Sequence, residues 1–227
     1  MKKRIGILLV ASLLLLTACG EKKTNVETKQ EGKAASAKVA SSEQAKKKAK
    51  VHYNGSYYSV KGKYDEIVIA NKHYPLSSDY NPGENPTAKA KLLELIAAMQ
   101  REGYPISHQY SGFRSYQTQV TLYQNYVNQD GKEAADRYSA RPGYSEHQTG
   151  LAVDINADGV NSTGNQVYKW LEKNAWQYGF ILRYPSDKED VTGTAYEPWH
   201  YRYVGKNAAE EIYHQGICLE EYITELE

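Results

Sequence analysis

Beyond residue 50, apolar positions recur every three or four residues in three segments, and this spacing predicts three helices. The first follows Asn85, a good capping residue, and has Pro86 at its first helical position. The second covers about residues 115–128, and the third covers about residues 166–178, before a glycine. We expect the first two of these helices to be scaffold.

Short apolar or alternating runs between the helices predict strands. They lie at residues 66–70, 151–156, 180–184 and 199–204. Alternation is strict in the second run, so Leu151, Val153 and Ile155 share one face and Asp154 points to the other. Helices combined with strands and short turns imply an α+β domain, in which helices flank one small antiparallel or mixed sheet.

Residues 1–18 have the pattern of an export signal, with a basic start, an apolar stretch and small residues before Cys19. The apolar stretch is too short to span about 30 Å of hydrocarbon comfortably. The Leu-Thr-Ala-Cys-Gly sequence resembles a bacterial lipobox, in which the cysteine becomes the acylated first residue. An ordinary signal peptide that contains a cysteine is the alternative. We expect a lipid on Cys19 that anchors the protein at the extracytoplasmic face of the bacterial membrane.

Residues 19–50 are rich in Lys, Ser and Ala and hold no aromatic residue, which predicts a disordered tether. Its positive charge would suit an anionic membrane or wall, and a plain solvated spacer is the alternative. The predicted folded domain, residues 51–227, holds all 21 Tyr, 3 Trp and 2 Phe. The second cysteine, Cys218, is expected to be a small buried residue.

The near-neutral total charge hides a division between these two parts. Residues 51–227 hold 16 of the 28 basic and 23 of the 27 acidic side chains, a formal net charge of −7. Neutralising phosphates requires a basic face, so this balance argues against a nucleic-acid partner. We expect a monomer.

Two histidines and two acidic residues are candidates for metal binding and catalysis. A loop from His147 into the strand that bears Asp154 can bring both side chains together, and His200 supplies a third donor. Two nitrogens and an oxygen satisfy the three protein ligands of a catalytic zinc, which leaves Glu197 for proton transfer. The alternative is structural: Asp154 ends a strand ladder by hydrogen bonding, and His200 is a satisfied core histidine.

Three blocks of sequence resemble the VanY-type D-alanyl-D-alanine carboxypeptidases, which are zinc peptidases. They are Ser-Gly-Phe-Arg-Ser at 111–115, Arg-Pro-Gly-Tyr-Ser-Glu-His-Gln-Thr-Gly-Leu-Ala-Val-Asp at 141–154, and Glu-Pro-Trp-His-Tyr-Arg-Tyr-Val-Gly at 197–205. The blocks occur in family order and spacing. Within the family, the lipoprotein L,D-carboxypeptidases of streptococci are the nearest likeness.

The resemblance implies that His147, Asp154 and His200 hold Zn²⁺ and that Glu197 is the general base. It also implies an α+β fold of the kind shared by these peptidases and the Hedgehog signalling domains.

Four further residues receive roles by the same resemblance. Arg114 corresponds to an arginine that the family uses at the substrate's terminal residue, where a guanidinium suits a carboxylate or a developing oxyanion. Gln119 and Ser145 match polar substrate-binding positions, and Tyr184 is expected to line the pocket. A structural role is the alternative for each of these last three.

For four other residues in these blocks, a structural role is expected first. Arg141 and Glu146 are expected to pair with each other or to cap turns. Trp199 is expected to pack in the core or form a pocket wall. Arg202 lies on the strand face of His200 and is expected to form a salt bridge on the sheet, or else to orient a ligand.

The implied activity is removal of a terminal D-alanine from peptidoglycan stem peptides by an anchored enzyme. The leading version is L,D-carboxypeptidase action on tetrapeptide stems, which leaves tripeptides. One alternative is D,D-carboxypeptidase action on pentapeptide stems. Another is a non-catalytic wall-binding module, although the intact set of ligands and Glu197 argues against it.

Overall fold

The computed structural model describes residues 50–157 and 166–226. The predicted signal segment, and all of the predicted tether except Lys50, fall outside these ranges. No helix in the described part of the chain is both long and apolar enough to cross a membrane.

The elements follow one another as strands, helices and short 3₁₀ turns, η1 and η2. In chain order they are β1 (His52–Tyr53), β2 (Tyr58–Lys61), β3 (Glu66–Ile69), α1 (Pro86–Arg101), β4 (Ile106–Ser111), α2 (Tyr116–Asp130), α3 (Lys132–Tyr138), η1 (Glu146–Thr149), β5 (Ala152–Ala157), α4 (Gln166–Asn174), η2 (Ala175–Tyr178), β6 (Phe180–Leu182), α5 (Glu189–Thr192), β7 (His200–Tyr203), α6 (Lys206–Gln215) and α7 (Leu219–Thr224). The expected α+β class is confirmed.

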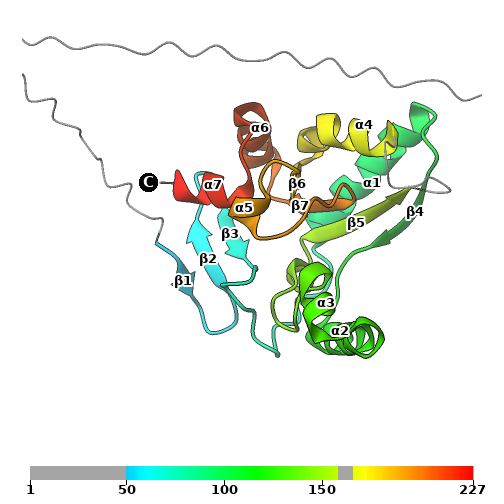
Figure 1. Ribbon diagram of the computed structural model, residues 1–227. Helices are drawn as coiled ribbons and strands as arrows, with labels where there is room; N and C mark the ends of the chain where they lie inside the picture. The colour runs from blue at the N-terminus through cyan, green and yellow to red at the C-terminus, as the bar shows by residue number, and fades with distance from the viewer. Residues whose placement is uncertain (1–49, 158–165, 227) are drawn as a thin grey trace, which may run out of the picture. The chain divides into compact units, whose positions relative to one another are not determined.

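The larger sheet has the order β4-β5-β7-β6, and its neighbouring strands are antiparallel. Helices α1 and α4 pack against it around one apolar core (Figure 1). The buried side chains of this core include Leu92, Ile96 and Met99 of α1, Val153 and Ile155 of β5, Leu171 of α4 and Tyr201 of β7. The predicted alternation of β5 is therefore confirmed: one face enters the core, and the other is left for polar side chains.

The start of α1 matches the sequence pattern closely. Asn85 caps it by accepting the backbone N–H groups of Thr87 and Ala88, and Pro86 opens the helix. Such a cap typically contributes about 1 kcal/mol.

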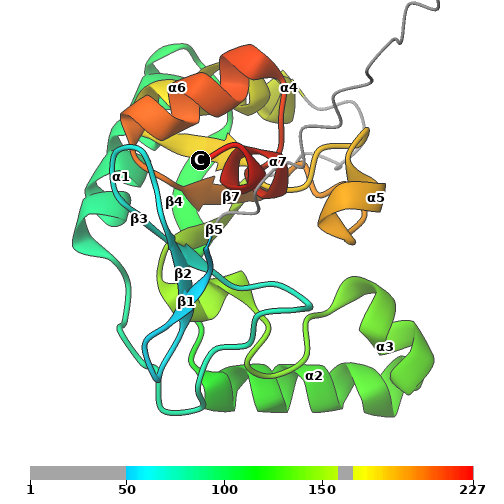
Figure 2. The same cartoon turned by 90° about the vertical axis from the view of Figure 1, so that its left-hand side faces the viewer.

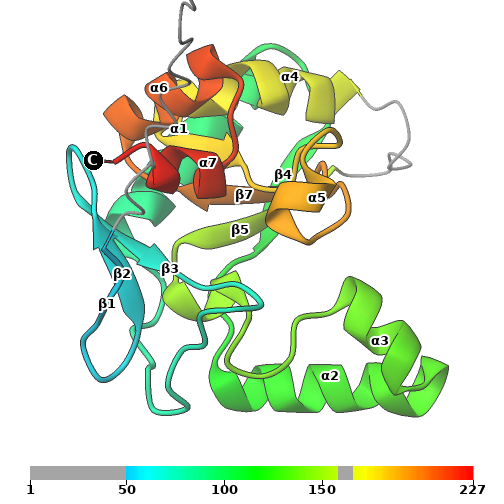
Figure 3. The same ribbon diagram turned by 60° about the vertical axis from the view of Figure 1, so that its left-hand side comes forward.

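The predicted strand at residues 66–70 is present as β3, but it belongs to a second sheet, β1-β2-β3, which was not expected from the sequence. This sheet is antiparallel and shares a second apolar cluster with the C-terminal helices α6 and α7, as Figure 3 allows the reader to follow. Val60 and Ile67 of the sheet, Ile212 of α6, and Leu219 and Tyr222 of α7 are all buried there. Cys218 is also buried, as predicted.

The second predicted helix is present as α2, but it contributes no side chain to either apolar core. Gln119 is its one fully buried side chain, and α2 packs chiefly on α3. Figures 2 and 3 show the α2–α3 hairpin and α5 on the same side of the domain, facing each other across a gap. Residues of this hairpin line the groove described below. The groove-lining residues of α2 are Gln119, Leu122 and Tyr126, whereas its apolar stripe lies in neither apolar cluster.

Candidate metal centre and active-site groove

Strand register places two of the three predicted ligands side by side. Asp154 of β5 is the direct cross-strand partner of His200 of β7. Opposed side chains of an antiparallel pair lie on the same face with Cβ atoms about 4.5–5.5 Å apart. The neighbours Val153 and Tyr201, also paired, enter the core on the other face. A slip of one residue would bury the two predicted ligands and expose the core residues, so the apolar alternation determines which side chains face the site.

The third residue, His147, reaches the same face from the 3₁₀ turn η1, where it is 5% exposed. The chain then reverses at Gly150, which has a φ of +70°. A Cβ at this position would lie 2.1 Å from the carbonyl oxygen of Gly83, so only glycine fits. The predicted folding back of the loop over Asp154 is what the structure shows.

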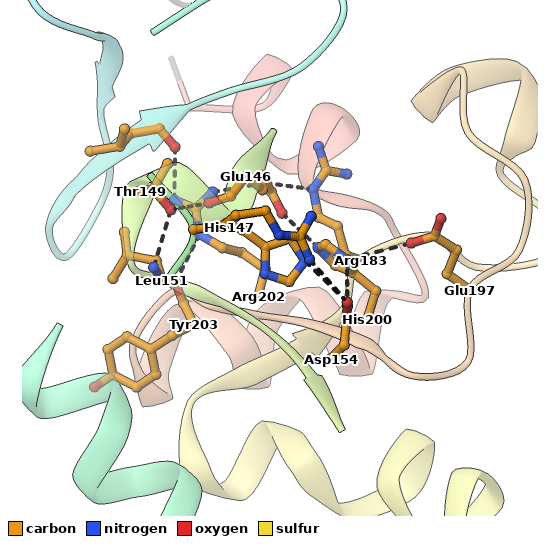
Figure 4. Close-up of polar contacts among 12 residues, drawn as sticks. Glu146, His147, Thr149, Leu151, Asp154, Arg183, Glu197, His200, Arg202 and Tyr203 are labelled. Atoms are coloured by element: carbon orange, nitrogen blue, oxygen red, sulfur yellow. Dashed lines mark hydrogen bonds and ion pairs between the residues drawn. The ribbon is translucent and has the colours of Figure 1, made fainter. Parts of the chain in front are cut away.

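The three side chains converge on one point (Figure 4). One donor atom from each of His147, Asp154 and His200 lies within 4.8 Å of the other two. His147 Nε2 is 3.3 Å from Asp154 Oδ2, and His200 Nδ1 is 3.1 Å from Asp154 Oδ1. Despite that short distance, Asp154 Oδ1 is buried and has no hydrogen-bond partner among the described residues. A carboxylate whose two oxygens each face a ring nitrogen, one of them without a hydrogen-bond partner, is the arrangement expected of metal ligands.

Hydrogen bonds on the outer side of both rings leave the inner nitrogens free to bind a cation. His147 Nδ1 lies 2.8 Å from the carbonyl oxygen of Gly112, to which it donates, so Nε2 carries a lone pair. His200 Nε2 lies 3.3 Å from a carboxylate oxygen of Glu146, which leaves Nδ1 as the donor atom. Two neutral imidazoles and one carboxylate fit zinc, with a fourth position for water.

The charge around the centre also suits a cation. Burial raises the pKa of Asp154, but the nearby histidines outweigh it and bring the pKa well below its usual range. Burial lowers the pKa of His200, whereas Asp154 and Glu146 raise it to about 9. The carboxylates therefore draw positive charge to this point, and a bound metal ion would displace the proton from His200.

Glu197 lies beside the centre without belonging to the three-donor group. Its Oε2 is 3.4 Å from His200 Nδ1, and its side chain is 21% exposed (Figure 4). Burial raises the pKa of Glu197, and the charges of Asp154 and Glu146 raise it further, against the opposing effect of His200. A carboxyl group with a raised pKa at the edge of the site suits proton transfer near neutral pH.

Arg114 is held in place next to the centre. Its guanidinium donates to Gln119 Oε1 at 3.0 Å and to Ser111 Oγ at 3.2 Å, and lies 4.0 Å from Asp154 Oδ2. Gln119 in turn donates to the carbonyl oxygen of Ala140 at 2.7 Å. Because these contacts engage both ends of its buried amide, Gln119 acts first as a support for Arg114.

A groove of about 620 Å³ contains the centre and extends to the α2–α3 hairpin. Ser145, Tyr184 and Trp199 line it together with Arg114 and Gln119. The ring of Tyr184 lies 5.0 Å from that of His200, and Trp199 also packs against the main core. This volume is in the range of binding sites that enclose a sizeable ligand.

The expected pairing of Arg141 with Glu146 is wrong. Arg141 forms a bidentate ion pair with Asp136 of α3 on the surface. Glu146 instead accepts hydrogen bonds from Arg183 and Arg202, both at 2.8 Å, beneath His200. Burial raises the pKa of Glu146, but the two arginines hold it well below its usual range.

Sequence reasoning missed Arg183 altogether, although a signal was present. Arg183 follows the apolar run 180–182 directly and is 1% exposed, like Arg202 within β7. An arginine in a buried strand requires a paired acid.

Comparison with known proteins agrees with this geometry. Residues 83–206 match the family described as VanY, D-alanyl-D-alanine carboxypeptidase. The chain belongs to the VanY family.

Individual relatives support the same assignment. An L,D-carboxypeptidase DacB from Streptococcus pneumoniae is 63% identical, with a TM-score of 0.74 over 78% of this chain and 96% of that one. A D,D-pentapeptidase VanY variant solved in complex with Zn(II) is 43% identical, with a TM-score of 0.60 over 68% and 97% of the two chains. A D-alanyl-D-alanine carboxypeptidase of Enterococcus faecalis is 43% identical over 69% of this chain and 65% of its own length.

These findings confirm the predicted family, fold and class of enzyme, a zinc carboxypeptidase.

Proposed function

We propose that this VanY-family protein is a zinc-dependent L,D-carboxypeptidase that removes the terminal D-alanine from tetrapeptide stems of peptidoglycan. The observation that carries the proposal is the convergence of His147, Asp154 and His200, with Glu197 beside them, in a groove large enough for a peptide. The 63% identity to an L,D-carboxypeptidase supports the choice of bond.

Zinc held by His147, Asp154 and His200 would lower the pKa of a water molecule to about 7 and polarise the scissile carbonyl. Glu197 accepts the proton of the attacking water and returns it to the leaving amine of D-alanine. Its raised pKa keeps the proton affinity of this carboxylate suited to both transfers.

Arg114 binds charge on the substrate. Its guanidinium faces the groove from a fixed position, because Gln119 and Ser111 each accept one of its N–H groups. A fixed guanidinium can bind the terminal carboxylate of the stem or the oxyanion that develops during attack. Ser145 and Tyr184 would complete the wall around the terminal residue.

Replacing Arg114 with lysine is expected to lower kcat/KM for tetrapeptide stems by roughly 10- to 100-fold, which is the size of one or two lost charge-assisted hydrogen bonds. Zinc content is expected to stay at the wild-type level. Steady-state kinetics and elemental analysis on one preparation measure both quantities. Arg101→Lys, at the end of α1 and outside the groove, is the matched control. Wild-type kcat/KM in Arg114→Lys would remove Arg114 from substrate binding.

The competing version is D,D-carboxypeptidase action on pentapeptide stems, which the VanY relatives favour. An equal mixture of tetrapeptide and pentapeptide muropeptides, followed by mass spectrometry over time, decides between the two. Loss of one alanine from the tetrapeptide first supports L,D action, whereas earlier loss from the pentapeptide supports D,D action. A zinc-loaded protein that shortens neither would be the non-catalytic wall-binding module.

We also propose that the domain acts outside the cell, anchored to the membrane by a lipid on Cys19. The Leu-Thr-Ala-Cys-Gly sequence and the short apolar stretch before it support this placement. Peptidoglycan, the proposed substrate, lies in the same compartment.

Cys19→Ala is expected to abolish lipid attachment and to leave the protein in the soluble or unprocessed fraction. Membrane fractionation with metabolic labelling by a fatty acid measures this directly. Cys218→Ala is the control, because that thiol is buried in the domain. Processed Cys19→Ala protein that still sediments with membranes would contradict the lipid anchor.

A further inference from the structure

Glu146 joins the proposed zinc ligand His200 to two buried arginines. Its side chain is 1% exposed, and its two oxygens have different partners. Oε1 accepts hydrogen bonds from Arg183 Nε and Arg202 Nη1, both at 2.8 Å, whereas Oε2 lies 3.3 Å from His200 Nε2 (Figure 4). Because two guanidinium groups fix the carboxylate, Oε2 has a defined position from which to accept the ring N–H.

The same contacts continue to the C-terminal helix. Arg183 donates from Nη1 and Nη2 to the two oxygens of Glu220 on α7, at 2.9 and 2.5 Å. Its backbone N–H also donates to the carbonyl oxygen of His200 at 3.1 Å. Bidentate pairs of this kind fix orientation as well as adding energy. The side chains of Glu220, Arg183, Glu146 and His200 therefore connect α7 to the face of β7 that carries the proposed ligand. The match to the VanY family ends at residue 206, before α7 begins.

Stability alone is a weak reason to bury this set of charges. Replacing a buried ion-pair network with apolar side chains of similar volume is often neutral or stabilising, because desolvating the charges is costly. Arg202 also donates to the carbonyl oxygens of Val68 and Tyr203, which fixes its guanidinium from a second direction. Such a rigid set is well suited to holding one ring in one orientation.

We propose that Glu146 is a positioning residue for His200 and that Glu220 extends this support to α7 through Arg183. Glu146 selects the tautomer that carries its proton on Nε2, which leaves Nδ1 for the cation, and sets the angle of the ring. The inference rests on the proposed zinc-dependent function and deepens it, because it makes the C-terminal helix part of the support of the metal site.

The first test is Glu146→Gln, which keeps the volume and removes the charge. Zinc affinity, measured by competition with a chromophoric chelator, is expected to fall roughly 10- to 100-fold, as for other residues that orient metal ligands. Unchanged zinc affinity would overturn the role of Glu146. This variant also removes the negative charge that pairs with the buried Arg183 and Arg202. Its folding is therefore checked by circular dichroism.

Two variants on α7, Glu220→Gln and its control Glu221→Gln, keep the proposal testable even if Glu146→Gln does not fold. Glu220 binds Arg183, whereas the adjacent Glu221 binds Lys188 and caps the helix at the backbone N–H of Cys218. Glu220→Gln is expected to weaken zinc binding roughly 2- to 30-fold, the range for residues within a coupled network. Glu221→Gln is expected to lower the thermal stability of the metal-free protein while leaving zinc affinity unchanged.

The absorption spectrum of the Co²⁺-loaded proteins adds a readout of ligand geometry. The spectrum is expected to change in Glu220→Gln and to stay as in wild type in Glu221→Gln. Wild-type affinity and spectrum in Glu220→Gln, or an equal loss of affinity in Glu221→Gln, would overturn the link to α7.

Wild-type protein is assayed first for zinc binding and D-alanine release. Zinc binding without release contradicts the proposed function but leaves this test intact, because its readout is metal affinity.

Discussion

Glu197→Gln is expected to keep wild-type zinc content and lose most of its turnover. Glutamine has nearly the same volume but cannot accept a proton from the attacking water. General-base catalysis typically contributes on the order of 10²- to 10⁴-fold, so kcat should fall by that factor. Tetrapeptide binding should change far less, because Arg114 and the groove are intact.

Zinc stoichiometry, tetrapeptide binding and D-alanine release are measured on one preparation of this variant. Glu189→Gln, in the exposed first turn of α5, is the matched control. Retained D-alanine release would remove Glu197 from the mechanism. Joint loss of zinc and activity would instead make Glu197 a ligand, in addition to the group formed by His147, Asp154 and His200.

Alanine at His147, Asp154 or His200 is expected to lower bound zinc and reduce turnover to the uncatalysed background. Each change removes one of three protein ligands, and a catalytic zinc site of this kind has no spare ligand to replace it. The fold should survive, because these side chains line the groove while Val153, Ile155 and Tyr201 hold the sheet from the other face.

Elemental analysis and circular dichroism report zinc and fold for each of the three variants. His108→Ala, at an exposed position of β4, controls for loss of a histidine as such. Full zinc occupancy in a folded His200→Ala protein would exclude His200 from the ligand set.

The sequence predicted those parts of the site that depend on local pattern. The alternation of residues 151–156 indicated which face of the strand carries Asp154. The structure then places His200 of β7 directly opposite it. Gly150 follows the turn that carries His147, at a position where only glycine fits. A glycine at this place in the motif therefore indicated that the chain turns back there.

Contacts between distant segments were not predictable in the same way. The partner of Glu146 could not be read from its neighbours, because Arg183 and Arg202 lie 37 and 56 residues away and meet it only in the folded core. Periodicity gave α2 an apolar stripe, but could not show that this stripe enters neither apolar core. β4 carries polar residues and an irregular register between Ile106 and Tyr110, so its strand pattern is weak. The signal segment and the tether remain predictions.

The central claim is tested most directly by D-alanine release from purified tetrapeptide muropeptides before and after metal removal. The protein is treated with a chelator, dialysed and divided, and zinc is restored to one half. We predict that the metal-free half releases no D-alanine and that zinc restores release, with a tripeptide as the only shortened product. Release by the metal-free half at the rate of the zinc-restored half would contradict the account.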